Sequence, residues 1–163
     1  MQRKRLFVTV GTHTQQFNRL LEKVDELVEG KKIKEEVFAQ TGNSSFEPKN
    51  FSFKKFLNAA EFEEKIGKSS IVISHGGAGA IISALRHNKP LVVVPRLLEF
   101  KEHTNSHQVD LAKALHEKGK AIAVFELSGL ENAVRKAKSF SPKVSEERKR
   151  LVKALNDFFG EGK

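Results

Sequence analysis

The stretch Ile71–Pro95, IVISHGGAGAIISALRHNKPLVVVP, decides the fold. It begins with a short β-branched run, Ile71 to Ser74, of the kind that fills a strand buried on both faces. A glycine-rich turn follows, and apolar residues then recur at helical spacing before Pro90 and a second apolar run, Leu91 to Val94. This order of strand, turn, helix and strand predicts most of a βαβ unit. Its turn would lie at the carboxyl end of a parallel strand, where backbone N–H groups and the positive end of a helix attract phosphate.

The rest of the chain also alternates strands with helices. Further strands are expected at Arg5–Val10, Glu35–Gln40, Phe51–Phe56 and Ala121–Phe125. Further helices are expected at about Gln15–Glu29, Ala59–Gly67 and Asn105–Glu117, then from an N-cap at Ser128 to Ser139 and from an N-cap at Ser145 to about Phe159. This alternation predicts an α/β fold with one doubly wound, Rossmann-like parallel sheet. Without a visible linker or repeat, we expect residues 1–163 to form a single domain.

Composition narrows the class of protein. The chain has 163 residues and no cysteine, which excludes thiolate chemistry and is consistent with a cytosolic location. The basic N-terminus MQRKR is followed by an apolar run too short for a signal peptide, and we expect no membrane span.

The net charge of +9 favours polyanionic partners such as nucleic acid, phosphorylated ligands or an anionic membrane surface. The basic residues mostly have glutamates nearby, as on ordinary solvated helix faces, and the chain contains no Trp or Tyr. These features disfavour a nucleic-acid-binding protein and leave a location at the membrane surface more plausible.

The central turn is the best candidate site in the sequence. Gly76, Gly77 and Gly79 could expose backbone amides to a phosphate, or could simply let helix and strand pack closely. His75 stands at the mouth of this turn, where it could contact a ligand or serve as a hydrogen-bonded structural residue.

A second turn, Gly11–Thr12, ends the first predicted strand at the same edge of the sheet. Its hydroxyl and backbone N–H groups could contact a second phosphate oxygen, so the two turns together predict a diphosphate site. The P-loop pattern GxxxxGK[ST] and the dinucleotide pattern GxGxxG do not occur. This disfavours a P-loop ATPase and an ordinary dinucleotide dehydrogenase.

A third cluster lies at the start of the predicted helix Asn105–Glu117. His103 and His107 are four residues apart and could form a metal pair, but HExxH is absent and no carboxylate stands at a third fixed spacing. Alternatively, His107 and Gln108 could hydrogen-bond a polyhydroxyl ligand, since an amide offers both a donor and an acceptor. As a third possibility, these residues could simply form the polar, solvent-exposed start of a surface helix.

Several segments together resemble one known family. They are Val8–Thr12, Gln40–Gly42, Ile73–Gly79, Lys89–Pro90, Val94–Arg96 and Glu102–Gln108. In this order and spacing they resemble the C-terminal, donor-binding half of GT-B glycosyltransferases of family 28. The likeness is greatest to stand-alone subunits of that family, such as the soluble UDP-N-acetylglucosamine transferase subunit of dolichol-linked glycan synthesis and bacterial exopolysaccharide or capsule galactosyltransferase subunits. It spans roughly Leu6 to Leu115 and implies one half of a GT-B fold.

The resemblance implies a UDP-sugar-dependent hexosyltransferase subunit that is inverting and needs neither a metal nor a cofactor. It implies His75 as the catalytic residue. The substrate-binding residues that it implies are Gly11, Thr12, His13, Gly42, Ser74, Gly76, Gly77, Ala78, Gly79, Ser83, Arg96, His103, His107 and Gln108. Many relatives carry a glutamate where this chain has Ser83 and use it to hold the ribose hydroxyls. A serine can form hydrogen bonds there but cannot supply a charged bidentate acceptor.

The same resemblance implies partners. A GT-B enzyme has two Rossmann-like halves, and 163 residues supply one. We therefore expect a membrane-anchored subunit to bind the acceptor, a lipid-linked glycan, and expect this chain to be cytoplasmic and peripheral at the cytoplasmic face of the membrane. The apolar face of the last predicted helix could dock on that partner or close this domain's own core. A non-catalytic nucleotide-sugar-binding or scaffolding module and a basic nucleic-acid-binding protein remain alternative classes.

Overall fold

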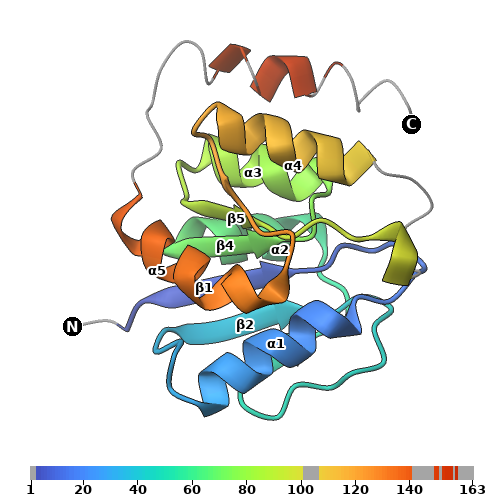
Figure 1. Ribbon diagram of the computed structural model, residues 1–163, viewed down its shortest axis with the longest axis vertical. Helices are drawn as coiled ribbons and strands as arrows, with labels where there is room; N and C mark the ends of the chain where they lie inside the picture. The colour runs from blue at the N-terminus through green and yellow to red at the C-terminus, as the bar shows by residue number, and fades with distance from the viewer. Residues whose placement is uncertain (1–2, 101–106, 141–148, 151, 156, 158–163) are drawn as a thin grey trace.

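Six parallel strands form one sheet in the order β3-β2-β1-β4-β5-β6 (Figure 1). The computed structural model describes residues 3–100, 107–140, 149–150, 152–155 and 157. The strands are β1 (Arg5–Thr9), β2 (Glu36–Gln40), β3 (Ser52–Lys54), β4 (Ile71–Ser74), β5 (Leu91–Val93) and β6 (Ile122–Ala123). The predicted α/β fold with a doubly wound parallel sheet is therefore confirmed.

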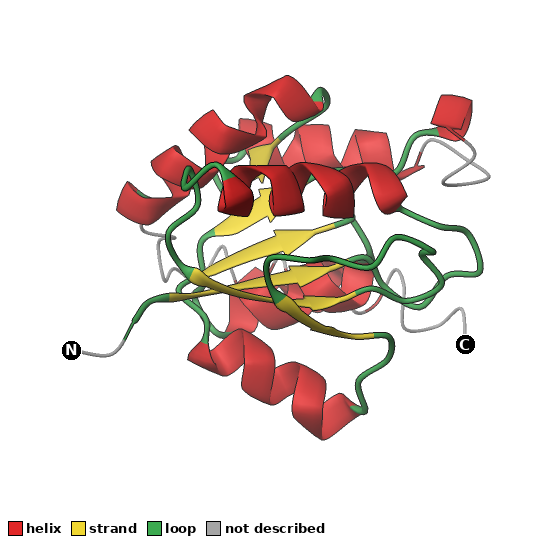
Figure 2. Ribbon diagram, turned by 90° about the horizontal axis from the view of Figure 1, so that it is seen from below, coloured by secondary structure: helices red, strands yellow, loops and turns green. Residues whose placement is uncertain are grey.

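Helices cover both faces of the sheet (Figure 2). They are α1 (Asn18–Glu29), α2 (Ala59–Lys68), α3 (Ala78–Arg86), α4 (His107–Glu117) and α5 (Leu130–Ser139), with 3₁₀ turns η1 (Leu98–Phe100) and η2 (Leu127–Gly129). Helices α1 and α5 pack in one hydrophobic cluster, and α2, α3 and α4 pack in another. Leu6 and Val8 of β1 point into the first cluster and Phe7 points into the second, as the twofold period of a strand requires.

The order of the strands places a switch point between β1 and β4. The chain runs outward from β1 to β3, then returns to β4 on the other side of β1. Thr9 pairs with Ser74 at the carboxyl ends of these two strands, so the loops that follow them leave the sheet side by side. Ligands of open parallel sheets bind in the crevice at such a point.

Several helices and strands begin or end at other residues than the sequence predicts. Helix α1 begins at Asn18 rather than near Gln15, because the carbonyl groups of Gln15 and Gln16 accept hydrogen bonds from Arg96. The N-cap prediction at Ser128 is wrong: the N-cap of α5 is Gly129, since residues 127–129 form a 3₁₀ turn before the helix. Strands β2, β3 and β6 are each shorter than expected.

The last predicted helix is partly described. The N-cap at Ser145 lies outside the described residues, whereas residues 149–150, 152–155 and 157 are helical. Leu155 is buried and Val152 packs against the cluster formed by α2, α3 and α4. Among the described residues, none of the helices combines the length and the apolar character that a membrane span needs.

Candidate functional site

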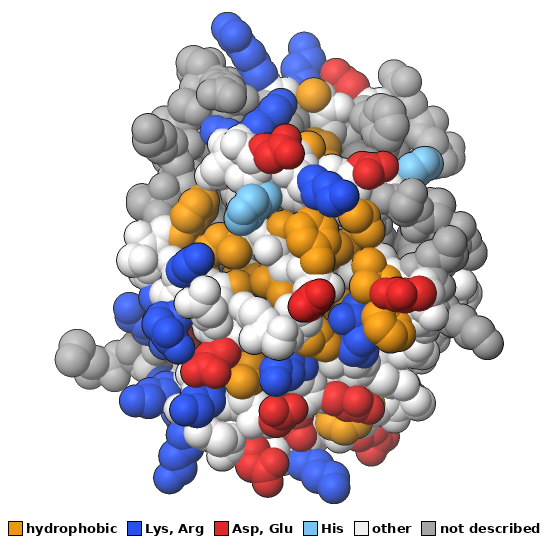
Figure 3. Space-filling model, viewed as in Figure 1, with side chains coloured by type: hydrophobic (Ala, Val, Ile, Leu, Met, Phe, Trp, Pro, Cys, Tyr) orange, Lys and Arg blue, Asp and Glu red, His pale blue; other side chains and the backbone are white. Residues whose placement is uncertain are grey.

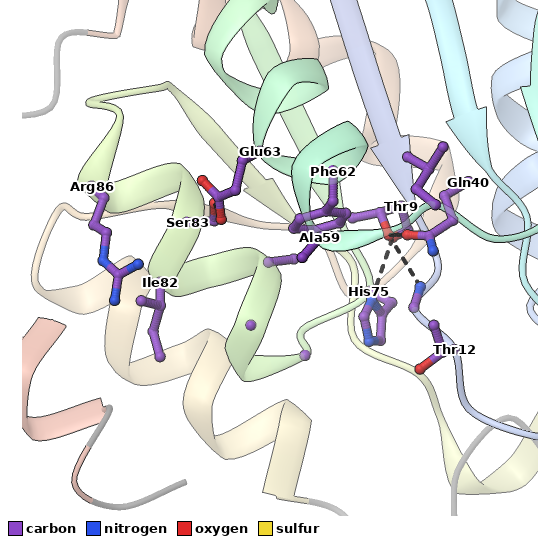
Figure 4. Close-up of a pocket in the computed structure, with 15 residues that line it drawn as sticks. Thr9, Thr12, Gln40, Ala59, Phe62, Glu63, His75, Ile82, Ser83 and Arg86 are labelled. Atoms are coloured by element: carbon purple, nitrogen blue, oxygen red, sulfur yellow. Dashed lines mark hydrogen bonds between the residues drawn. The ribbon is translucent and has the colours of Figure 1, made fainter. Parts of the chain in front are cut away.

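The loops after β1 and β4 border a cavity of about 590 Å³ at the carboxyl edge of the sheet (Figure 4). Its size is that of an ordinary small-molecule site. Helices α2 and α3 form its remaining walls. The lining residues are Thr9, Gly11, Thr12, Gln40, Leu57, Ala59, Phe62, Glu63, His75, Gly77, Gly79, Ala80, Ile82, Ser83 and Arg86.

The imidazole ring of His75 lies between the two glycine turns. A Cβ atom on Gly77 would stand 2.3 Å from its Nε2 atom, and one on Gly11 would stand 2.6 Å from the same atom. Only glycine at both positions leaves room for the ring. His75 Nδ1 lies 3.4 Å from the backbone oxygen of Thr9, and the residue is 9% exposed. These glycines therefore serve close packing around His75, which joins the two loops.

Hydrogen bonds hold the backbone of both turns. The N–H of Gly11 donates to the Thr9 hydroxyl (3.2 Å), which donates in turn to Oε1 of Gln40 (2.9 Å). In the second turn, the N–H of Gly76 donates to the Ser74 hydroxyl (3.3 Å). The amides of Gly11 and Gly76 are thus engaged within the protein.

Helix α3 brings its N-terminus to the cavity. Its N-cap is Gly77, and within the described part of the chain no side chain caps it. The first N–H groups of a helix, here those of Ala78, Gly79 and Ala80, have no partner inside the helix. A Cβ atom on Gly79 would meet nothing within 4 Å, so the space beside it is open. The positive end of the helix dipole favours an anion at this point.

The opposite wall is polar and charged. Ser83 of α3 donates a hydrogen bond to Oε1 of Glu63 on α2 (2.6 Å), and Oε2 of Glu63 lies 2.9 Å from Nε2 of His87. The hydrogen bond from Ser83 lowers the pKa of Glu63 below its usual value, and His87 and Arg86 act in the same direction against partial burial. Glu63 is therefore a carboxylate at neutral pH. Beside it, Leu57, Ala59 and Phe62 give the cavity an apolar side.

The structure brings six of the expected site residues to this cavity: Gly11, Thr12, His75, Gly77, Gly79 and Ser83. Four more, among them Gly76 with its N–H bonded to Ser74, are not in the cavity lining but adjoin it. Gly42 has a φ of +56° and approaches the backbone oxygen of Gly11, to which a Cβ atom would stand at 2.5 Å. Ser74 holds the central turn by its hydroxyl, and Ala78 begins α3.

Arg96 and Gln108 take structural positions. Arg96 is 1% exposed, and its guanidinium group donates to the carbonyl groups of Val10, Gln15 and Gln16. Oε1 of Gln108 accepts from the N–H of Arg96 at 3.3 Å. Both residues tie loops together instead of lining the cavity.

The remaining predicted residues are not in the cavity lining or lie outside the described residues. His13 and His107 are exposed and do not line it, and His103 lies outside the described residues. In the part of the chain that the structure describes, no three His, Cys, Asp or Glu side chains gather as a metal site.

Sequence reasoning missed Glu63 and Arg86. Helical spacing in Ala59–Gly67 identified Phe62 as inward, but the residue next to Phe62 reaches the cavity only because α2 packs on α3. No local pattern marks such a residue.

The chain is similar to known glycosyltransferase sequences. Residues 5–158 match the model of the "Glycosyltransferase family 28 C-terminal domain". The UDP-N-acetylglucosamine transferase subunit ALG13 of Homo sapiens is 36% identical over 125 residues, which cover 71% of this chain and 10% of that protein. The ALG13 subunit of Cryptococcus neoformans is 39% identical over 82 residues, covering 49% of this chain and 38% of that protein. The chain thus spans about a tenth of the length of the human relative.

Solved structures agree on the fold. The glycotransferase of kitacinnamycin superposes with a TM-score of 0.68 at 21% identity, covering 95% of this chain and 40% of the other. The NMR structure of ALG13 superposes with a TM-score of 0.63 at 20% identity, covering 94% of this chain and 96% of that one. At such low sequence identity, these similarities show only the fold. That fold is one Rossmann-like half of the GT-B type.

Proposed function

Because the chain belongs to the glycosyltransferase family 28 C-terminal domain family, we propose that it is the donor-binding subunit of a UDP-sugar-dependent hexosyltransferase. One observation carries this proposal: a cavity of about 590 Å³ combines the N-terminus of α3 with an apolar side and a carboxylate. A nucleoside diphosphate has matching parts, namely a diphosphate, a flat base and a ribose.

The proposed mechanism rests on electrostatic stabilisation of the leaving group. The first amides of α3 and the hydroxyl of Thr12 would bind the diphosphate, and the dipole of α3 would stabilise charge as the sugar departs. A metal ion is then unnecessary, and we propose inversion at the sugar carbon. His75 lines the cavity beside this N-terminus, and we propose it as the catalytic residue.

We further propose that a membrane-anchored partner subunit binds the acceptor, a lipid-linked glycan, so that this chain works at the cytoplasmic face of the membrane. The ALG13 relatives are subunits of a UDP-N-acetylglucosamine transferase, which supports the existence of a partner. On the face drawn in Figure 3, Lys and Arg side chains are interspersed with Asp and Glu, which supports a protein or lipid partner better than an extended nucleic acid.

Calorimetry with UDP, UDP-N-acetylglucosamine and UDP-galactose tests the donor site. We expect UDP to bind, and we expect the two UDP-sugars to bind with different affinities. Absence of any binding at millimolar concentration would contradict the proposal. Binding without sugar transfer in the presence of the partner subunit would instead identify a non-catalytic nucleotide-sugar-binding module.

In a sugar-transfer assay with the partner subunit present, His75→Ala should lower turnover at least about a hundredfold. This is the effect expected for loss of an acid–base or transition-state contact. Wild-type turnover in this variant would remove His75 from the catalytic role.

A further inference from the structure

Glu63 is a carboxylate that no sequence pattern pointed to. It comes from α2, yet it lines the same cavity as the N-terminus of α3 (Figure 4). Its side chain is 45% exposed, so it can meet a ligand without moving. Its position is fixed by Ser83 at 2.6 Å on one oxygen and by His87 at 2.9 Å on the other.

The hydrogen bonds to Ser83 and His87 occupy about half of the acceptor positions of the Glu63 carboxylate. An ionised carboxylate has about four acceptor positions on its two oxygens. Ser83 and His87 occupy one on each oxygen, which leaves about one free acceptor on each. A pair of adjacent hydroxyl groups supplies the matching number of donors, one for each oxygen.

The position along α3 suits the ribose of a nucleotide. Ser83 lies five residues after Ala78, which is about 7.5 Å along a helix. A diphosphate at the N-terminus of α3 would therefore have its ribose hydroxyls near Ser83 and Glu63. The apolar residues Leu57 and Phe62 would then be available to the base.

Ser83 joins the two helices at this wall of the cavity. Its hydroxyl on α3 donates a hydrogen bond to one carboxylate oxygen of Glu63 on α2, which holds Glu63 in place. We propose that Glu63, positioned by Ser83 and His87, accepts hydrogen bonds from the 2′- and 3′-hydroxyls of the donor's ribose and so selects ribonucleotides. This inference rests on the proposed function.

The test compares UDP with 2′-deoxy-UDP and 3′-deoxy-UDP by calorimetry on the wild type, on Glu63→Gln and on Glu64→Gln. Glu64 is the matched control, because it is the neighbouring glutamate on α2, pairs with Lys68 and does not line the cavity. The wild type and Glu64→Gln should prefer UDP at least about tenfold over each deoxynucleotide, the usual effect of a hydrogen bond to a charged group. Glu63→Gln should bind all three within about threefold.

The outcomes separate this inference from the function on which it rests. If the wild type binds no UDP, the donor site itself is overturned. If the wild type binds UDP and both deoxynucleotides equally, the role of Glu63 is overturned without any variant. If Glu63→Gln keeps the wild-type preference for UDP, another residue reads the ribose and the inference is wrong. Thermal unfolding of each variant verifies that it is folded.

Discussion

His75 packs tightly between two glycines of the site, Gly11 and Gly77. The ring fills the space where side chains on Gly11 and Gly77 would lie. The glycine-rich turn therefore has a structural role, to make room for the His75 ring, in addition to any contact with phosphate. Packing and ligand binding are both expected to depend on these positions.

Replacing Gly77 with alanine should displace the ring. The new Cβ atom would come within 2.3 Å of His75 Nε2, so the ring or the turn must shift. We expect the free energy of unfolding to fall by about 1–3 kcal/mol, as for other overpacked sites, and the affinity for UDP to fall as well. Urea denaturation and calorimetry measure the two effects.

The matched control is Gly79→Ala, two residues further along the chain in the first turn of α3. A Cβ atom on Gly79 meets nothing within 4 Å, and alanine restricts the unfolded chain. We expect the free energy of unfolding to stay level or to rise by about 0.4–1 kcal/mol. Equal stability of Gly77→Ala and the wild type would contradict the tight packing of His75.

At the scale of elements, an ion pair joins the end of α5 to Glu35, the residue just before β2. Nζ of Lys138 lies 3.0 Å from Oε1 of Glu35, whose side chain is only 6% exposed. Burial raises the pKa of Glu35, but hydrogen bonds from Lys138 and from the backbone outweigh this effect and hold the pKa below its usual value. The folded protein therefore favours the charged form of Glu35.

Lys138→Met should remove about 1–2 kcal/mol from the free energy of unfolding at pH 7, less than for a fully buried pair because Lys138 is 37% exposed. A lowered carboxyl pKa contributes stability above its unfolded value of 4.5, and this contribution disappears as the pH falls through the folded pKa. The difference between wild type and variant should therefore shrink at pH 3.

Urea denaturation at pH 7 and pH 3 measures this dependence. Lys136→Met, an exposed lysine on the same helix, is the control and should change stability by less than about 0.5 kcal/mol. A difference between Lys138→Met and the wild type that is as large at pH 3 as at pH 7 would show that the pair does not act through the charge of Glu35.

For the whole molecule, the helical residues near the C-terminus complete the core. Leu155 is 7% exposed and lies in the cluster that contains α2, α3 and α4. This position favours a helix that closes its own domain over one whose apolar face awaits a partner.

Leu155→Ala should therefore lower the free energy of unfolding of the isolated chain by about 2 kcal/mol, through lost burial and the cavity left behind. The exposed Lys153→Ala control should be neutral within about 0.5 kcal/mol. Thermal or urea unfolding decides the point. If Leu155→Ala is as stable as the control, the segment contributes nothing to the core.

Local patterns determined the fold class of this protein and the approximate place of most elements. The β-branched run Ile71 to Ser74, the turn after it and the helical spacing up to Leu85 each depend on neighbours in sequence, so they could be interpreted without coordinates. The two turns could also be placed at one edge, because parallel strands share their carboxyl ends.

Only the tertiary structure decided which side chains meet at that edge. The His75 ring fills the space beside Gly11 and Gly77, Arg96 anchors the first loop from the interior, and Glu63 enters the cavity from another helix. Apart from the near neighbours His75 and Gly77, these contacts join residues 20 to 86 positions apart. They arise when helices and loops pack against one another, and no periodicity within a single segment encodes such packing.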